Sequence, residues 1–122
     1  MTAVVYRVFD VEGALLYIGS TSDFGARKAV HLATHATPIA FTIQTCVTRW
    51  ETTDYPDMAA AKAAEIAAIR NEAPYLNRQH NPTRWAKRDG GWVPLLPEYV
   101  RPSRLVPSLD LMELLGLTPS AA

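Results

Sequence analysis

Six side chains in the first two thirds of the chain could together bind a metal ion, move a proton and hold an anion. They are Tyr6, Tyr17, Arg27, His31, Glu65 and Asn77. Phenol and imidazole groups transfer protons, a carboxylate binds hard divalent cations, and a guanidinium pairs with oxyanions. If the fold gathers them, these residue types can perform acid–base chemistry on a negatively charged substrate.

The carboxylate of Glu65 has an unusual position on a predicted helix, residues 57–72. The other members of its stripe on that helix are Met58, Ala61 and Ile69. A carboxylate within an apolar stripe is costly unless it has a partner. That partner could be a divalent cation such as Mg²⁺, or it could be Lys62 or an arginine in a salt bridge. Glu65 could also lie at the edge of the stripe, and the helix alone does not choose among these possibilities.

Two segments rich in β-forming residues, Ala3–Asp10 and Ala14–Ser20, flank Gly13 and predict a β-hairpin. A symmetric loop of two or four residues would place Tyr6 opposite Tyr17 on one face of the sheet. The two phenol groups would then converge. The alternative interpretation is ordinary cross-strand packing of buried aromatic rings.

A helix is predicted from about Phe24 to Thr34, with Ser22 or Asp23 as its N-cap. Arg27 and His31 are four residues apart, so they share a face of this helix. Their common face is expected to border one cleft. The alternatives are a surface ion pair for the arginine and a structural role for the histidine.

Two further elements complete the predicted domain, residues 1–81. A third strand is expected at about Thr42–Thr53, after Pro38, and the alanine-rich helix Asp57–Glu72 is expected to end before Pro74. The order strand, strand, helix, strand, helix predicts an α+β fold, with a small three-stranded, mainly antiparallel sheet flanked by helices.

Residues 82–122 are predicted to form a Pro-rich C-terminal extension. Five prolines between positions 82 and 107 interrupt any long element, and Gly90-Gly91 adds a turn. Ser108 is expected to cap a short last helix, Leu109–Leu115. Its many leucines indicate docking on the domain or on a partner, which includes a second copy of the chain.

Composition excludes several classes of protein. A chain of 122 residues with 48% hydrophobic residues is large enough for one globular domain, and no apolar run approaches the roughly 20 residues needed to span a bilayer. The segment Met1–Val4 lacks the features of a signal peptide. Cys46 is the single cysteine, which excludes an internal disulfide and a cysteine-based zinc site. A cytoplasmic protein is therefore expected.

The net charge is zero, but the charge is unevenly distributed. Residues 70–104 contain seven basic and three acidic side chains, which suggests a phosphate-facing surface, although an ordinary solvated surface would look the same. The candidate contacts to nucleic acid are Arg78, Arg84, Lys87 and Arg88. Trp85 and Trp92 lie among them and could stack on an unpaired base.

The order of these residues resembles that of the GIY-YIG nuclease family. Tyr6 closes Val4-Val5-Tyr6, and the second motif, Tyr17-Ile18-Gly19, is intact. In the first motif Val4 and Val5 replace the glycine and isoleucine that name the family. The resemblance covers about Ala3 to Asn77 and implies a three-stranded sheet between helices.

The resemblance also implies roles for the six residues. Glu65 would be the single metal ligand, for Mg²⁺ or Mn²⁺. Tyr6 would activate the attacking water, and Tyr17 would orient water or phosphate. Arg27 and His31 would counter the charge on the phosphate, and Asn77 would support the site and could contact the phosphate.

Together these roles imply a metal-dependent endonuclease that cuts DNA and leaves 5′-phosphate and 3′-hydroxyl ends. His35 and His80 are further candidates for the site, but their spacing does not show whether they belong to it. Two other hypotheses remain. One is a catalytically silent module of the same fold that binds nucleic acid or docks a partner, and the other is a structural or regulatory protein that dimerises through its leucine-rich end.

Overall fold

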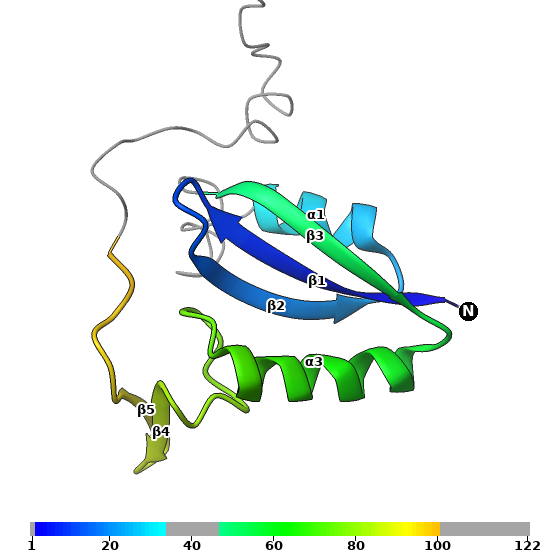
Figure 1. Ribbon diagram of the computed structural model, residues 1–122. Coiled ribbons are helices and arrows are strands. Elements are labelled where there is room, and N and C mark those ends of the chain that lie inside the picture. The colour runs from blue at the N-terminus through cyan, green and yellow to red at the C-terminus, as the bar shows by residue number, and fades with distance from the viewer. Residues whose placement is uncertain (1, 34–46, 101–122) are drawn as a thin grey trace, which may run out of the picture.

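The computed structural model describes residues 2–33 and 47–100. Its central sheet has three antiparallel strands in the order β2-β1-β3, where β1 is Ala3–Asp10, β2 is Leu15–Thr21 and β3 is Val47–Tyr55. Helices α1 (Phe24–Ala33) and α3 (Met58–Glu72) flank the sheet (Figure 1). The predicted α+β class with a small antiparallel sheet is confirmed.

The β1–β2 register differs from the predicted one. The loop has three residues instead of two or four: Asp10 N–H bonds to the carbonyl of Ala14 over 3.0 Å, and Gly13 has a φ of 84°. A bulge at Leu16 then adds a second one-residue shift. Tyr6 therefore pairs with Gly19, and direct pairing with Tyr17 was wrong.

The two shifts sum to two residues, which is the side-chain period of a strand. Tyr17 therefore still lies on the same face of the sheet as Tyr6, diagonally across from it, with 6.2 Å between the ring centroids. The expected convergence of the two phenol rings survives the change of register.

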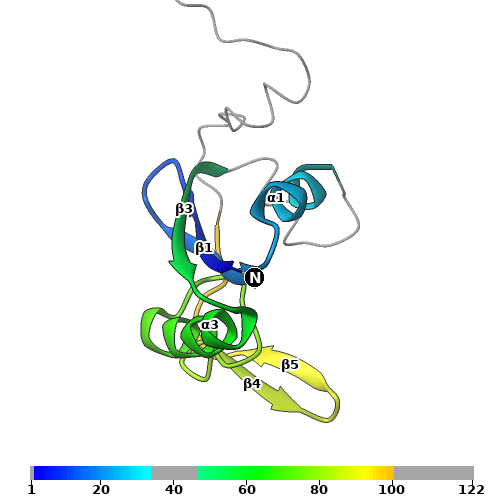
Figure 2. The ribbon, with the colours of Figure 1, turned by 90° about the vertical axis from the view of Figure 1, so that its right-hand side faces the viewer.

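The two helices cover different faces of the sheet (Figure 2). Alternate residues of β1 point to opposite faces, so Val5 faces α3, where it packs in a cluster with Ala61 and Ile69. Tyr6 points the other way and packs against Phe24 of α1. The candidate site residues therefore come from both layers of the molecule.

Helix α3 forms where its sequence predicts. The Asp57 side chain caps it by accepting the N–H of Ala60 over 2.7 Å. Ala73 ends it in the left-handed conformation and donates its N–H to the carbonyl of Ile69. Alanine along the helix lets the backbone approach the sheet closely, which brings position 65 to the edge of β2.

The chain after α3 runs along the outer edge of β2. Tyr75 and Leu76 donate their N–H groups to the carbonyls of Leu15 and Leu16, over 3.2 and 2.8 Å. The segment thus pairs with an edge strand that would otherwise expose unpaired backbone groups. It also holds the second motif in place from outside the sheet.

A two-stranded hairpin, β4 (Trp85–Arg88) with β5 (Gly91–Pro94), lies beyond the C-terminal end of α3 (Figure 1). Asp89 and Gly90 form its turn with φ angles of 49° and 79°, as Asp-Gly does in tight hairpins. The sequence analysis placed only a turn here. Its signal was Asp89-Gly90 between two short runs that each contain a tryptophan.

Several predictions fall on residues that are not described. They are the helix Leu109–Leu115, the start of the third strand before position 47, and His35. Among the described helices, none has the length and apolar character that crossing a membrane would require.

Candidate active site

A cavity of about 530 Å³ lies where the hairpin of β1 and β2 meets both helices. Its lining includes four of the six predicted site residues, Tyr6, Tyr17, Arg27 and Glu65. Tyr6 and Tyr17 come from the sheet, Arg27 from α1 and Glu65 from α3. Tyr6 and Glu65 are far apart in the sequence. Gly19, Ser20 and Lys62 also line it.

Tyr6 is almost fully buried, and its hydroxyl lies against Gly19. A Cβ at Gly19 would collide with the Tyr6 hydroxyl oxygen and the ring carbon that carries it. Glycine is therefore required here by the close approach of a phenol, and not by a turn. The phenol ring is further enclosed by Phe24 and Trp50, with centroid separations of 5.7 and 6.2 Å.

The Tyr6 hydroxyl is 3.0 Å from Nε2 of His31. His31 also makes edge contacts with the rings of Tyr6 and Tyr17, so the three rings form one cluster. Its spacing from Arg27 brings both side chains of α1 to this region, as the shared helix face predicts. Asp23 caps α1 by accepting the N–H of Ala26 over 3.1 Å.

Burial controls the protonation of these groups. Desolvation, followed by the charge of a Tyr17 phenolate, raises the pKa of Tyr6 well above its ordinary value, and Arg27 only partly offsets this. Desolvation and the Glu65 charge also raise the pKa of Tyr17. Desolvation and then Arg27 lower the pKa of His31. At neutral pH both phenols are therefore protonated and the imidazole is uncharged.

The Glu65 carboxylate is buried in the apolar stripe, with a side chain only 9% exposed, and it has two polar partners. Lys62 Nζ lies 2.8 Å from Oε2, and Ser20 Oγ donates to the same oxygen over 2.9 Å. Of the possibilities left open by the sequence, the salt bridge to Lys62 is thus present. It does not exclude a cation, because a lysine that is 57% exposed can move.

The donor set around Glu65 suits a hard cation. It consists of oxygen: a carboxylate, the Ser20 hydroxyl and the phenols in the same cavity. Within residues 2–33 and 47–100, no group of three or more His, Cys, Asp or Glu side chains could form a cage for a metal. Mg²⁺ is often held by one or two carboxylates together with water and substrate phosphate. A single buried carboxylate fits that pattern.

Asn77 does not line this cavity but lines a second one beside it, and its side chain holds β2. Its carboxamide oxygen accepts the N–H of Ile18 over 2.9 Å, and its amide nitrogen donates to the carbonyl of Ile18 over 2.8 Å. The side chain therefore pairs with β2 as a strand backbone would, 59 residues away in sequence. This differs from a turn residue bonding to its own backbone, which was the alternative from sequence.

Three further residues that the sequence analysis did not select support the site. Ser20, next to the second motif, bonds to Glu65. Buried Asn81 donates to the carbonyls of Pro74 and Asn77, over 2.8 and 2.9 Å. Asp10 accepts the N–H of Ala14 over 2.8 Å and so holds the β1–β2 loop. Only Ser20 had a sequence signal, its place directly after an intact motif.

The four basic residues predicted to contact nucleic acid have different environments. Arg84 donates to the carbonyl of Ala73 and stacks on Tyr75 at 3.9 Å, so it holds the chain together after α3. Arg78 lies over Trp85 and Lys87 over Trp92, at 4.9 and 5.5 Å. Both are exposed, as is Arg88 at the end of β4.

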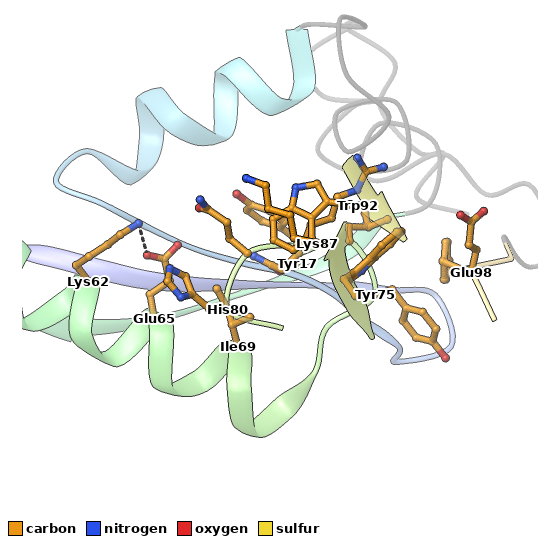
Figure 3. Close-up of a pocket in the computed structure, with 15 residues that line it drawn as sticks. Tyr17, Lys62, Glu65, Ile69, Tyr75, His80, Lys87, Trp92 and Glu98 are labelled. Carbon is orange, nitrogen blue, oxygen red and sulfur yellow. Dashed lines mark ion pairs between the residues drawn. The ribbon is translucent and has the colours of Figure 1, made fainter. Parts of the chain in front are cut away.

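A second cavity, of about 640 Å³, adjoins the first (Figure 3). The two share Tyr17, Lys62 and Glu65. The lining of the second also includes Arg78, Lys87 and His80, whereas Arg84 and Arg88 are not part of it.

Comparison with known proteins identifies the family of the chain. A family model described as the GIY-YIG catalytic domain matches residues 2–81. No curated protein and no solved structure matches the chain. The matched range contains all six candidate residues and most of the chain. The chain therefore belongs to the GIY-YIG family, which is a family of nucleases.

Proposed function

We propose that this protein is an endonuclease that hydrolyses phosphodiester bonds in DNA with the help of Mg²⁺ or Mn²⁺. The observation that carries the proposal is the convergence of Tyr6, Tyr17, Arg27 and Glu65 on one cavity from three parts of the fold. Packing alone does not require two phenols, a guanidinium and a buried carboxylate to share one opening.

Glu65 would hold the cation, with the Ser20 hydroxyl beside it. When bound, a divalent cation supplies positive charge opposite the phosphoryl oxygens and lowers the pKa of its water. Lys62 would release Oε2 and direct its ammonium group toward the substrate phosphate. Arg27 would donate paired hydrogen bonds to the phosphate oxygens, where negative charge increases in the transition state.

Tyr6 and His31 would move the proton of the attacking water together. A phenol with a raised pKa is seldom ionised at neutral pH, so Tyr6 alone would be a poor base. A neutral His31 protonated at Nδ1 can accept the Tyr6 proton at Nε2, across the 3.0 Å contact. As water gives a proton to the Tyr6 oxygen, the Tyr6 proton would pass to His31. Tyr17 would orient the water or the phosphate.

The products expected from the family resemblance are a 5′-phosphate and a 3′-hydroxyl. The water oxygen would form a bond to phosphorus, and the bond from phosphorus to the 3′ oxygen would break. The displaced 3′ oxygen would take a proton from solvent or from a neighbouring acid. Ligation of the cleaved DNA without prior end repair would identify these ends.

One observation favours a second candidate, a catalytically silent nucleic-acid-binding or partner-docking module. Glu65 already has a lysine and a hydroxyl as partners, which would satisfy a buried carboxylate without a metal. Dimerisation through the leucine-rich end also stays a prediction, since residues 101–122 are not described.

Cleavage of supercoiled plasmid separates the two candidates. Wild-type protein should nick or linearise plasmid with Mg²⁺ and lose this activity in a chelator. Glu65→Gln should reduce the rate by about 100-fold or more, because it removes the metal ligand and keeps the shape. Glu51→Gln, on the exposed surface of β3, is the matched control and should cut normally. A Glu65→Gln protein as active as wild type would disprove the site.

The same assay tests the proton relay. Tyr6→Phe should slow cleavage more than Tyr17→Phe, since the Tyr6 hydroxyl lies 3.0 Å from Nε2 of His31, the proposed proton acceptor. If Tyr17→Phe is the more severe change, the base is Tyr17 and the relay through His31 is wrong.

A further inference from the structure

The second cavity is a continuation of the candidate active site. Its near end consists of Lys62 and Glu65, joined by their ion pair, and Figure 3 shows Glu98 at the opposite end. Between the two ends, Tyr17 and the β4–β5 hairpin contribute to the lining. A molecule bound there would therefore extend from the residues proposed to cut.

We propose that this cleft binds an unpaired nucleotide of the substrate strand, next to the phosphate that is cut. Its base would stack on Trp92 in place of the Lys87 ammonium group, which lies 5.5 Å from the ring centroid, and its phosphate would meet Lys87 and Arg78. The inference rests on the proposed function, because it assumes that the strand is cut beside Glu65. It adds a substrate class, which is DNA with a single-stranded or unpaired region.

The hairpin register explains which side chains face the cleft. Lys87 pairs with Trp92 and Trp85 with Pro94, so these side chains share one face of the hairpin. Trp85, Lys87 and Trp92 all line the cleft. Arg88 is on the other face of the hairpin and does not line it. The arrangement places indole rings and a cation on one surface.

This surface is held firmly to the matched domain. The carbonyl of Asn81 accepts the N–H groups of Arg84 and Trp85, and the carbonyl of Arg84 accepts the N–H of Leu95 over 2.7 Å. The guanidinium of Arg78 stacks on Trp85. The side of the cleft formed by Trp85 and Trp92 is thus preorganised, which reduces the entropy lost when a base binds.

The chemistry of the lining fits a nucleotide. Aromatic rings stack on any base with an exposed face, and a base inside a duplex has none. Arg78 and Lys87 supply positive charge for a phosphate, and Lys62 adds to it at the near end. Among the described residues of the lining, Glu98 is the one carboxylate besides Glu65, and it lies at the far end (Figure 3). The volume lies in the range of roughly 300–1,000 Å³ that is typical of ligand pockets.

Binding of the full chain to two fluorescent DNAs in a chelator tests the inference without cleavage. One DNA is a fully paired duplex, and the other has the same sequence with a single-stranded arm. Wild-type protein should bind the armed DNA at least about fivefold more tightly, since the stacking of one base on an aromatic ring corresponds to roughly 5- to 150-fold in affinity. Trp92→Ala should remove this preference and leave duplex binding unchanged.

Two controls accompany Trp92→Ala. Trp92→Phe retains an aromatic ring and should keep most of the preference, which separates stacking from a folding defect. Val93→Ala changes an exposed side chain of the same hairpin on the other face and should leave the preference unchanged. Lys87→Ala should weaken binding of the armed DNA and lower its salt dependence by about one unit of slope.

The outcomes distinguish this inference from the proposed function. If the protein prefers the armed DNA through Trp92 but never cuts DNA with Mg²⁺, nucleotide binding in the cleft is supported and the proposed nuclease activity is overturned. Equal affinity for the two DNAs, or a Trp92→Ala protein with an unchanged preference, overturns the cleft even if plasmid is cut.

Discussion

At the scale of single residues, the immediate surroundings of each side chain in the candidate site determine its protonation and its polar contacts. Burial keeps the phenols of Tyr6 and Tyr17 protonated and His31 uncharged. Glu65 lies in an apolar helix stripe and has Lys62 and Ser20 as its polar partners. The pKa values of Tyr6, Tyr17 and His31 therefore differ from those of the free side chains. Small displacements of these groups should change the rate of cleavage.

Gly19→Ala is the sharpest test at this scale. The added methyl group would collide with the Tyr6 hydroxyl, so Tyr6 must move and its contact with His31 must lengthen. A shift of about 1 Å at a reacting group can reduce a rate about 100-fold, and we expect a loss of that order in plasmid cleavage. Gly25→Ala is the control, because its new Cβ would approach no closer than 3.8 Å to Asp23. Full activity in Gly19→Ala would show that Tyr6 is not required where it lies.

At the scale of elements, the segment after α3 positions the site by pairing with β2. Backbone groups of Tyr75 and Leu76 and the side chain of Asn77 continue this pairing from Leu15 to Ile18. Tyr17 and Gly19 are the neighbours of Ile18, so the edge that faces the cavity is supported from outside. Asn77 thus acts as a positioning residue.

Asn77→Ala should be strongly destabilising. It leaves a buried N–H and a buried carbonyl of Ile18 without partners, at a cost of roughly 2–4 kcal/mol. For a domain of this size, the melting temperature should fall by at least about 8 °C. Asn71→Ala, on the exposed face of α3, should change stability by less than about 0.5 kcal/mol. Equal melting temperatures for the two variants would contradict the positioning role.

At the scale of the whole molecule, two clusters share the sheet. Tyr6, Val8 and Leu16 form the core on one face, and Val5 and Ile18 pack against α3 on the other. Titratable groups belong to the first of these cores, with Tyr6 fully buried and His31 in contact with its ring. Their protonation should therefore influence the stability of the entire fold.

Stability should be greatest between about pH 6.5 and pH 10. His31 has a lowered pKa in the folded state, so the unfolded chain binds its proton first as the pH falls below about 6.5, and stability is lost. The tyrosines have raised pKa values, so the unfolded chain loses their protons first above about pH 10. Urea midpoints across this range should show both slopes. His31→Gln should reduce the acid slope and leave the alkaline slope; an unchanged acid slope would refute the contribution of His31.

Short-range rules were sufficient for much of this protein. The bounds of α1 and α3 to about one residue, the N-cap at Asp23 and the shared face of Arg27 and His31 follow from propensity and helical period. The stripe that contains Glu65 was also predicted, except that Met58 is exposed. These features depend on residues within one or two helical turns of each other, so they can be predicted from the sequence alone.

The amino-acid sequence by itself therefore determined the family, the fold class and the identity of the candidate groups. Only the tertiary structure decided the register that sets Tyr6 on Gly19, the pairing of Asn77 with Ile18, and the cleft beside the β4–β5 hairpin. A loop of three residues and a one-residue bulge are nearly equal in local energy to their alternatives, so the choice falls to burial of Leu16 and to distant partners. Contacts between residues that lie far apart in the chain have no local period from which they could be predicted.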